Sequence, residues 1–321
     1  MAYSSGGLIE ATDYNGFVST TSGANVNNVW STGSTDSGWG QSALATVAAA
    51  GSITATQWAS LVNTISSMAS QTGTTITSRS APVAGNTIEI LAALNTDLTN
   101  ITANRQNAVA NGTQFTGYTG TNSKTAATSG ATWSITFVNT VTFASADAAR
   151  YFFNAGGRIK IDVSKTATGA TGDPEWNDLA NTLCGDIFIT GGTATQTIAG
   201  ANYTGTTKVG GTGTPNILLT TTGWYDLTAG AAATIVYKQF ADTAPYTNNF
   251  IQHSIAKGAS SDTLVITTLW SASDGDPISG GTASSGATPG TAPTTIVTYF
   301  PPSTTYLTAS WGTPTIAATT T

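Results

Sequence analysis

Few side chains in this 321-residue sequence could transfer a proton or bind a metal. There is one His, His253, and one Cys, Cys184. Catalysis of the Ser-His-Asp or Cys-His type needs a His held against a nucleophile by a third group. His253 instead lies within an alternating strand pattern, and no G-x-S-x-G motif accompanies it. A zinc site needs more ligands than one His and one Cys supply. We therefore expect no catalytic residue, no metal site and no cofactor.

Carboxylates could still hydrolyse a glycoside, because that reaction needs only two acids at a suitable separation. The acidic residues gather in two places, which are Asp173, Glu175, Asp178 and Asp186, and then Asp274 with Asp276. Simpler interpretations exist for both groups, since Asp173 and Glu175 suit the start of a helix and Ser-Asp-Gly-Asp-Pro is typical of a turn. The glycines at 210–213 lack the Lys-Ser/Thr of a phosphate loop. We interpret the chain as non-enzymatic and keep a polysaccharide depolymerase as the less favoured alternative.

The composition indicates a folded chain with an unusually uncharged surface. Charged residues make up 8% of the sequence, against about 25% in ordinary globular proteins. Apolar residues make up 40%, with 8 Trp, 10 Tyr and 10 Phe, which argues against disorder. The net charge of −6 and the lack of a basic cluster argue against nucleic-acid binding. No apolar run approaches the roughly 20 residues of a membrane span, and no secretory signal is apparent, so we expect neither membrane insertion nor export.

Two amphipathic helices are expected in the N-terminal third. Thr54 and Gln57 form a capping-box pattern before an apolar stripe that includes Trp58, Leu61 and Ile65, and Gly73 ends this helix. A second helix, opening at Thr87, carries an apolar seam at 3-4-3 spacing, namely Leu91, Leu94, Leu98 and Ile101. The two stripes pack either on each other or in a helical bundle between subunits. The second possibility makes these seven residues a candidate assembly interface.

The first 51 residues are rich in Gly, Ser and Asn, with only scattered apolar residues and one short helix expected from Thr12. Few apolar groups are present to offset the entropy of ordering this segment. We expect that any order here comes from a neighbouring subunit.

The remainder predicts an α+β, mainly β fold. Nine short strands are expected, at residues 133–143, 157–163, 186–189, 195–199, 217–227, 234–240, 250–256, 263–270 and 294–300. Short strands separated by Gly-rich turns are typical of an antiparallel β-sandwich or jelly-roll. One inserted helix is expected from Asp173 to Gly185, with Pro174 in its first turn. The predicted domains are a helical assembly or attachment domain at 1–115, a linker at 116–130 and the β-sandwich domain at 131–321.

A short aromatic segment stands out between two of these strands. Ser145 and Asp147 suit the start of a helix, and a glycine pair suits its end. The motif itself consists of Arg150, Tyr151, Phe152, Phe153, Asn154, Gly156 and Gly157. We expect its aromatic side chains to close one end of the β-core.

Several segments resemble structural proteins of tailed-bacteriophage virions. They are RYFFNAGG at 150–157 with the strand sequence before it, GWGQ at 38–41, ITATQWASLVNTI at 53–65, QTGT at 71–74, PYTNNFIQHSIAKG at 245–258 and TTYLTASWGTPTI at 304–316. The resemblance spans most of the chain in the same order. It implies a virion component of the tail, baseplate, neck or a fibre, assembled in the bacterial cytoplasm.

This family assignment implies that the partners are copies of the chain, in a trimer or larger ring, and other virion proteins. A receptor- or glycan-binding appendage module is the main alternative. In that case exposed aromatic residues would stack on sugars of the host surface. The candidates for this role are Trp224, Tyr225, Tyr246 and Tyr299.

Overall fold

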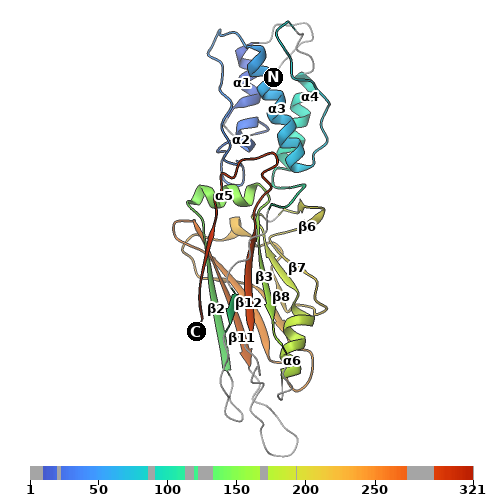
Figure 1. Cartoon of the computed structure of the whole chain (residues 1–321), viewed down its shortest axis with the longest axis vertical. Helices are drawn as coiled ribbons and strands as arrows, with labels where there is room; N and C mark the ends of the chain where they lie inside the picture. Colours follow the sequence, from blue (N-terminus) through green and yellow to red (C-terminus); the bar gives the residue numbers. More distant parts are fainter. Residues whose placement is uncertain are drawn as a thin grey trace, which may run out of the picture.

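The structure, a computed structural model, describes residues 10–19, 23–85, 91–112, 119–121, 133–166, 173–192, 194–272 and 293–320. The molecule is elongated, with helices gathered at one end and a β-sandwich below them (Figure 1). We call residues 10–103 of the described part the helical head. The mainly antiparallel α+β class expected from the sequence is confirmed.

The head contains four helices, α1 (Ala11–Val18), α2 (Val26–Trp30), α3 (Ala55–Thr72) and α4 (Leu91–Ala103). The predicted start of α3 is confirmed, because Thr54 Oγ1 accepts from Gln57 N–H at 3.2 Å while Gln57 Oε1 accepts from Thr54 N–H at 2.8 Å. Gly73, with φ of 70°, ends the helix as expected. The predicted opening of α4 at Thr87 lies outside the described residues.

The N-terminal segment is held by its own chain. Tyr14 and Phe17 of α1 contact the Trp58 ring of α3, with centroid distances of 6.0 and 6.3 Å. The Asn15 amide bonds both the N–H and the C=O of Val47, each at 2.8 Å, and Asn27 bonds Leu44 in the same way. The expectation that order here requires a neighbouring subunit is therefore wrong for residues 10–19 and 23–51.

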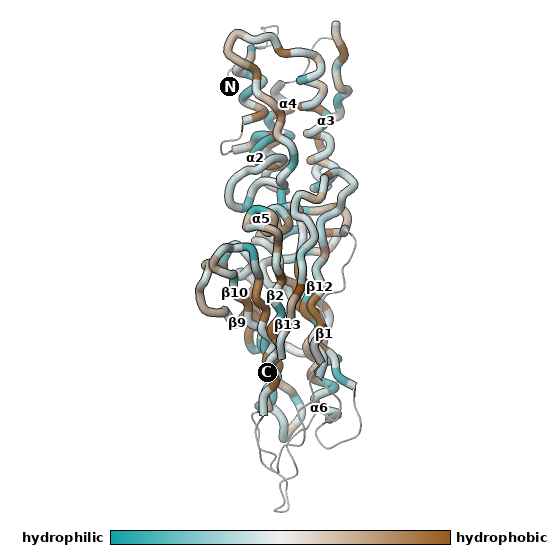
Figure 2. Tube along the Cα trace, turned by 60° about the vertical axis from the view of Figure 1, so that its left-hand side comes forward, coloured by the Kyte–Doolittle hydropathy of each residue, from teal (hydrophilic) through white to brown (hydrophobic). Residues whose placement is uncertain are grey.

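Two antiparallel sheets form the sandwich. The five-stranded sheet has the order β1 (Thr119–Thr121), β12 (Thr294–Phe300), β3 (Arg158–Ser164), β4 (Asp186–Ile189) and β7 (Thr206–Val209). The six-stranded sheet has the order β13 (Thr315–Thr320), β2 (Trp133–Thr142), β11 (Thr263–Ala272), β10 (Phe250–Lys257), β9 (Thr234–Phe240) and β8 (Ile217–Leu218). Hydrophobic residues concentrate along β2, β9, β10 and β12 (Figure 2).

The strands bury alternate residues, as the sequence period predicts. Along β2 the residues from Trp133 to Thr142 alternate strictly between buried and more exposed positions. β11 follows the same period and pairs with β2 over its whole length. The buried residues of the two sheets, together with those of the head, form one continuous core.

The remaining elements lie around the sandwich. They are α5 (Ala146–Asn154), α6 (Asp173–Asp178), the π-helix η1 (Leu179–Cys184), the 3₁₀ helix η2 (Trp224–Asp226) and the hairpin of β5 (Gln196–Ile198) with β6 (Ala201–Tyr203). The helix predicted from Asp173 is thus confirmed as α6 and η1 together. The hairpin, rather than a single strand at 195–199, follows β4.

Two predictions about the sandwich need correction. The strand expected at 217–227 ends at Leu218, because Trp224 N–H donates to Thr190 O and the Asp226 carboxylate accepts from Gly223 N–H, which sets a helical turn there. Thr119–Thr121, within the predicted linker, pairs with β12 as strand β1. The rest of that linker, 116–118 and 122–130, lies outside the described residues.

Candidate functional site

The aromatic motif forms α5, which lies between the head and the sandwich (Figure 1). Ser145 Oγ accepts from Ala148 N–H at 3.0 Å, and Arg150 pairs with Asp147 at 2.9 Å along the helix. Gly156 follows with φ of 93°, and a Cβ there would lie 2.7 Å from Ala108 Cβ. These contacts confirm the predicted start and end of the helix, and they require glycine at position 156.

The aromatic residues of α5 close the end of the β-core, as predicted. Phe152 and Phe153 are fully buried, and Tyr151 nearly so. Phe153 stacks on Trp224 at 5.2 Å, and both phenylalanines contact Phe143 at the end of β2. Each such pair contributes about 0.5–1.5 kcal/mol beyond its buried area. The cluster therefore fixes α5 to the sandwich.

The segment at 38–41 binds α5 from the side of the head. Trp39 Nε1 donates to the carbonyls of Arg105 and Asn154, at 3.0 and 3.1 Å. Asn154 Nδ2 returns a bond to Gly38 O at 3.0 Å, and Arg150 donates to Ser37 O at 2.7 Å. Trp39 and Asn154 are both fully buried. Buried polar groups with reciprocal partners make this contact specific in geometry.

Two glutamines extend this network to distant parts of the chain. Gln41 donates to Thr308 O at 3.0 Å and accepts from Thr308 N–H at 2.8 Å, 267 residues along the sequence. Gln71, near the end of α3, donates to Ala155 O at 3.3 Å. We call these residues at 37–41, 71, 105, 150–157 and 308–311 the junction. It ties the head, α5 and the C-terminal segment into one unit.

Close packing at the junction also excludes side chains at Gly40. This residue has φ of 68°, and a Cβ there would lie 2.4 Å from the Tyr151 ring. Burial raises the pKa of Tyr151, with the nearby Asp147 adding to that effect. Burial likewise raises the pKa of Tyr225, whose hydroxyl donates to Asn154 Oδ1 at 2.5 Å. Both phenols remain protonated, and the Tyr225 hydroxyl is a structural hydrogen-bond donor.

The residues weighed for catalysis are held in structural roles. His253 is fully buried, stacks on Tyr237 at 5.3 Å and bonds Thr268 Oγ1 through Nδ1 at 3.0 Å. Burial lowers the pKa of His253 to about 3. Cys184 is also buried, and burial raises the pKa of its thiol to about 12. The imidazole is therefore neutral and the thiol protonated, and both lie away from solvent.

The acidic residues of the first predicted group lie on two elements, α6 and β4. Asp173 begins α6, whereas Asp186 lies at the start of β4 and pairs with Lys160 at 3.5 Å. Among the described residues no group of three or more His, Cys, Asp and Glu could hold a metal ion. Residues 210–213 lie between β7 and β8 and begin no helix. Asp274 and Asp276 lie outside the described residues.

The aromatic residues considered for sugar stacking belong to the core. Trp224, Tyr246 and Tyr299 are 3%, 7% and 4% exposed, and Tyr225 packs against the same core while partly buried. An aromatic ring must present a free face to stack on a sugar. Trp224, Tyr246 and Tyr299 therefore offer no free face to a sugar, whereas the partly buried Tyr225 borders a second pocket of about 350 Å³.

The predicted assembly interface is also buried within the chain. Trp58, Leu61, Ile65, Leu94, Leu98 and Ile101 are at most 2% exposed. Leu91 begins α4, and its side chain lies outside the described part. The described stripes thus pack on each other and on α1 and α2, which agrees with the intrachain alternative.

The comparisons add no family to this description. Neither known protein families, nor curated proteins, nor solved structures give a match to the chain. Within the described ranges, no helix has the length and apolar character needed to cross a membrane.

Proposed function

We propose that this chain is a non-enzymatic structural protein of a tailed-phage virion, in the tail, baseplate, neck or a fibre. In this role it assembles with copies of itself, as a trimer or larger ring, and docks onto other virion proteins. The observation that carries the proposal is the junction. Four of the segments that resemble virion proteins, at 38–41, 71–74, 150–157 and 304–316, meet there in one hydrogen-bonded network.

The nature of those contacts supports a mechanical role. The junction holds buried amides, indole and backbone groups in reciprocal bonds, and the aromatic cluster beneath it fixes the head to the sandwich. Such a network resists bending between the two parts. A virion component that transmits or bears load needs this rigidity.

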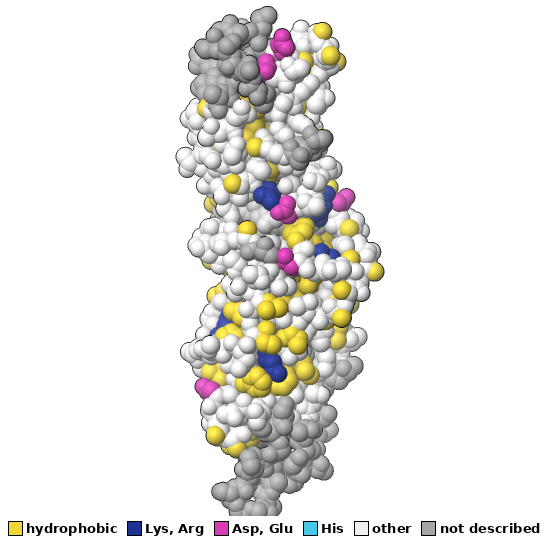
Figure 3. Space-filling model, turned by 180° about the vertical axis from the view of Figure 1, so that it is seen from behind, with side chains coloured by type: hydrophobic (Ala, Val, Ile, Leu, Met, Phe, Trp, Pro, Cys, Tyr) yellow, Lys and Arg dark blue, Asp and Glu magenta, His cyan; other side chains and the backbone are white. Residues whose placement is uncertain are grey.

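The outer face of the six-stranded sheet supports assembly between copies. Its outward residues alternate with the buried ones along β2, β11, β10 and β9, and they include Thr136, Val138, Val265, Leu269, Gln252, Phe250, Lys238 and Phe240. Lys238 is the one charged residue among those just named. Hydrophobic side chains gather over the sandwich when the molecule is seen from behind (Figure 3). We call this surface the open face.

A second copy of the chain is the occupant that this face suits. The cores of subunit interfaces are depleted in charge, as the open face is. A partner with a strongly charged surface would gain little from Thr, Val and Leu. Closed symmetry then requires that each copy present the same residues.

Light scattering after size exclusion tests this assembly. The wild-type chain should elute as a trimer or larger ring, and Leu269→Lys should shift it to monomer, with at least a tenfold weaker association. Ile296→Lys is the matched control, because Ile296 is a half-buried outward residue of the other sheet, opposite Asp162. A monomeric wild-type protein, or equal effects of the two variants, would contradict assembly through the open face.

Docking in the virion requires a second measurement. Crosslinking and mass spectrometry of intact phage particles should link the head of this chain to another virion protein. Particles that lack the chain altogether would overturn the proposed function.

A further inference from the structure

A polar cleft lies at the end of the sandwich far from the head. It is formed by η1, by the loop between β7 and β8, and by the end of β9 with the loop that follows. The opposite end of β10 carries Lys257, whose Nζ lies 4.5 Å from the Trp224 ring beneath α5. The cleft therefore faces away from the junction. Its volume is about 640 Å³, and it is lined by Leu183, Thr212, Gly213, Thr214, Asn216, Gln239, Phe240, Ala241, Asp242, Thr247 and Asn248.

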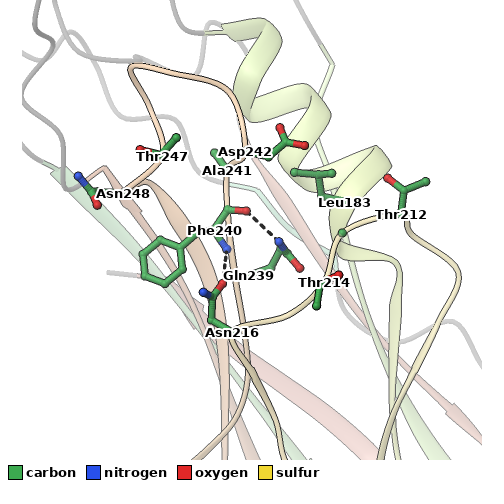
Figure 4. A pocket seen from close by; sticks show the side chains of 11 residues that line it. Leu183, Thr212, Thr214, Asn216, Gln239, Phe240, Ala241, Asp242, Thr247 and Asn248 are labelled. Atoms are coloured by element: carbon green, nitrogen blue, oxygen red, sulfur yellow. Dashed lines mark hydrogen bonds between the residues drawn. The ribbon is translucent and has the colours of Figure 1, made fainter.

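The lining offers many hydrogen-bonding groups and little charge. Three residues carry hydroxyls, three carry amides, and Asp242 supplies the single carboxylate, with no cation among the lining residues. The side chains reach the cleft from both sides, and the Phe240 ring stands at its edge (Figure 4). This lining suits a neutral ligand with many hydroxyl groups and disfavours an anion.

Gln239 provides the most informative group. The residue is 5% exposed, and its Nε2 donates to Phe240 O at 2.9 Å. Its Oε1 is buried and has no hydrogen-bond partner within the described part of the chain. A buried acceptor without a donor costs about 1–3 kcal/mol. Gln239 also lines the cleft, so a small rotation of its amide would bring this oxygen to a ligand hydroxyl that supplies the donor.

Neighbouring groups continue the same pattern. Asn216 is exposed, and its Oδ1 accepts from Phe240 N–H at 3.4 Å, which directs the amide nitrogen away from that bond. Asp242 is exposed too, and it accepts from Thr243 Oγ1 through Oδ1 only. One amide donor, one buried amide acceptor and one carboxylate can together bind adjacent hydroxyls, which act as both donors and acceptors.

We infer that this cleft binds a neutral saccharide, with Gln239, Asn216 and Asp242 bonding its hydroxyls. The cleft binds rather than cleaves, because glycoside hydrolysis needs two carboxylates and the lining has one. This inference goes beyond the proposed function. It assigns sugar contact to residues other than Trp224, Tyr225, Tyr246 and Tyr299.

Binding to sugars tests the inference on the full-length protein. An array of neutral and acidic bacterial-surface oligosaccharides identifies hits, and calorimetry with the strongest neutral hit gives the affinity. We expect neutral hits, with at least tenfold weaker binding by Asp242→Asn and by Asn216→Ala. Asp262→Asn is the matched control, since this acid lies in the turn at the head-proximal end of β10 and should leave binding unchanged.

Three results would overturn the inference. They are hits confined to acidic sugars, no neutral hit on the array, or equal binding by wild type, Asp242→Asn and Asn216→Ala. Light scattering on the same samples measures the oligomeric state independently of sugar binding. A wild-type oligomer that binds no neutral sugar refutes the cleft and leaves the proposed function standing.

Discussion

The two sheets share one core but differ in what covers their outer faces. On the five-stranded sheet, Lys160 lies 3.8 Å from Asp162 and 3.5 Å from Asp186, and the β5–β6 hairpin packs near Arg158. On the six-stranded sheet the open face has one cation, Lys238, among threonine and apolar residues. The first face is completed by its own chain and by ion pairs. The outward residues of the second face are partly exposed and form no ion pair within the described part of the chain.

On both faces a cation lies over aromatic rings, but the two cations differ in burial. The Arg158 guanidinium lies 4.7, 4.9 and 5.6 Å from the rings of Phe300, Tyr203 and Phe188, and the residue is 4% exposed. Lys238 Nζ lies 3.6 Å from the Phe250 ring and 4.5 Å from Phe240. A cation over aromatic rings stabilises more when water is excluded. The covered pair therefore contributes to folding, whereas the open pair remains available at the surface.

Substituting the two cations should give the largest difference in stability between the two faces. We expect Arg158→Ala to lower the free energy of unfolding by about 2–4 kcal/mol, because it removes three ring contacts and the bond to Asn111 Oδ1 at 2.7 Å. Lys238→Ala should lower it by less than about 1 kcal/mol. Urea unfolding, followed by tryptophan fluorescence, measures both.

Arg158→Met tests whether packing or charge stabilises this site, because Met fills the space without a charge. Burial already lowers the pKa of Arg158, which reflects the cost of placing a cation there. If packing dominates, Met should recover part of the stability lost in the Ala variant. Equal losses for Arg158→Ala and Lys238→Ala would show that the two faces do not differ as described.

A smaller effect is expected from the ion pairs of the covered face. Lys160→Met leaves Asp162 and Asp186 without their shared cation, and should lower the free energy of unfolding by about 1 kcal/mol at low salt. The loss should shrink as salt is added, since both carboxylates are partly exposed. Urea titrations at two ionic strengths measure this, and a loss independent of salt would point to packing instead.

Local patterns predicted much of this molecule, and long-range contacts did not follow from them. The capping box at Thr54, the start of α5 at Ser145 and the alternation in β2 are set by residues close in sequence. The bond between Gln41 and Thr308 spans 267 residues, and nothing in either segment alone specifies the other. Strand β13 consists of Thr and Ala after Ile316, so it lacks the apolar alternation that marks β2.

The residues of a functional site were harder to predict, because burial and long-range contacts decide their roles. An aromatic residue such as Trp224 has the same sequence signature in a core as in a sugar site, and only its burial distinguishes the two. The apolar stripe of α3 likewise predicts a buried face without naming the neighbour that buries it. The cleft had no sequence signal, because Asn216, Gln239 and Asp242 are ordinary polar residues in strands and loops that converge only in the fold.

The smallest expected effect concerns Asp162 on the covered face and depends on pH. Burial raises the pKa of this carboxyl above 3.8, and the nearby Asp186 adds to the rise, against the opposing effect of Lys160. A raised folded-state pKa means that the folded protein binds the proton more tightly than the unfolded chain, so ionised Asp162 lowers stability at neutral pH. Asp162→Asn should therefore be more stable than wild type at pH 7, by less than about 1 kcal/mol for this partly exposed group. The difference should shrink towards pH 4, as the wild-type carboxyl takes up its proton. Urea unfolding of both proteins across this range measures the trend, and a variant that is less stable at pH 7 would mean that the pairing with Lys160 outweighs burial.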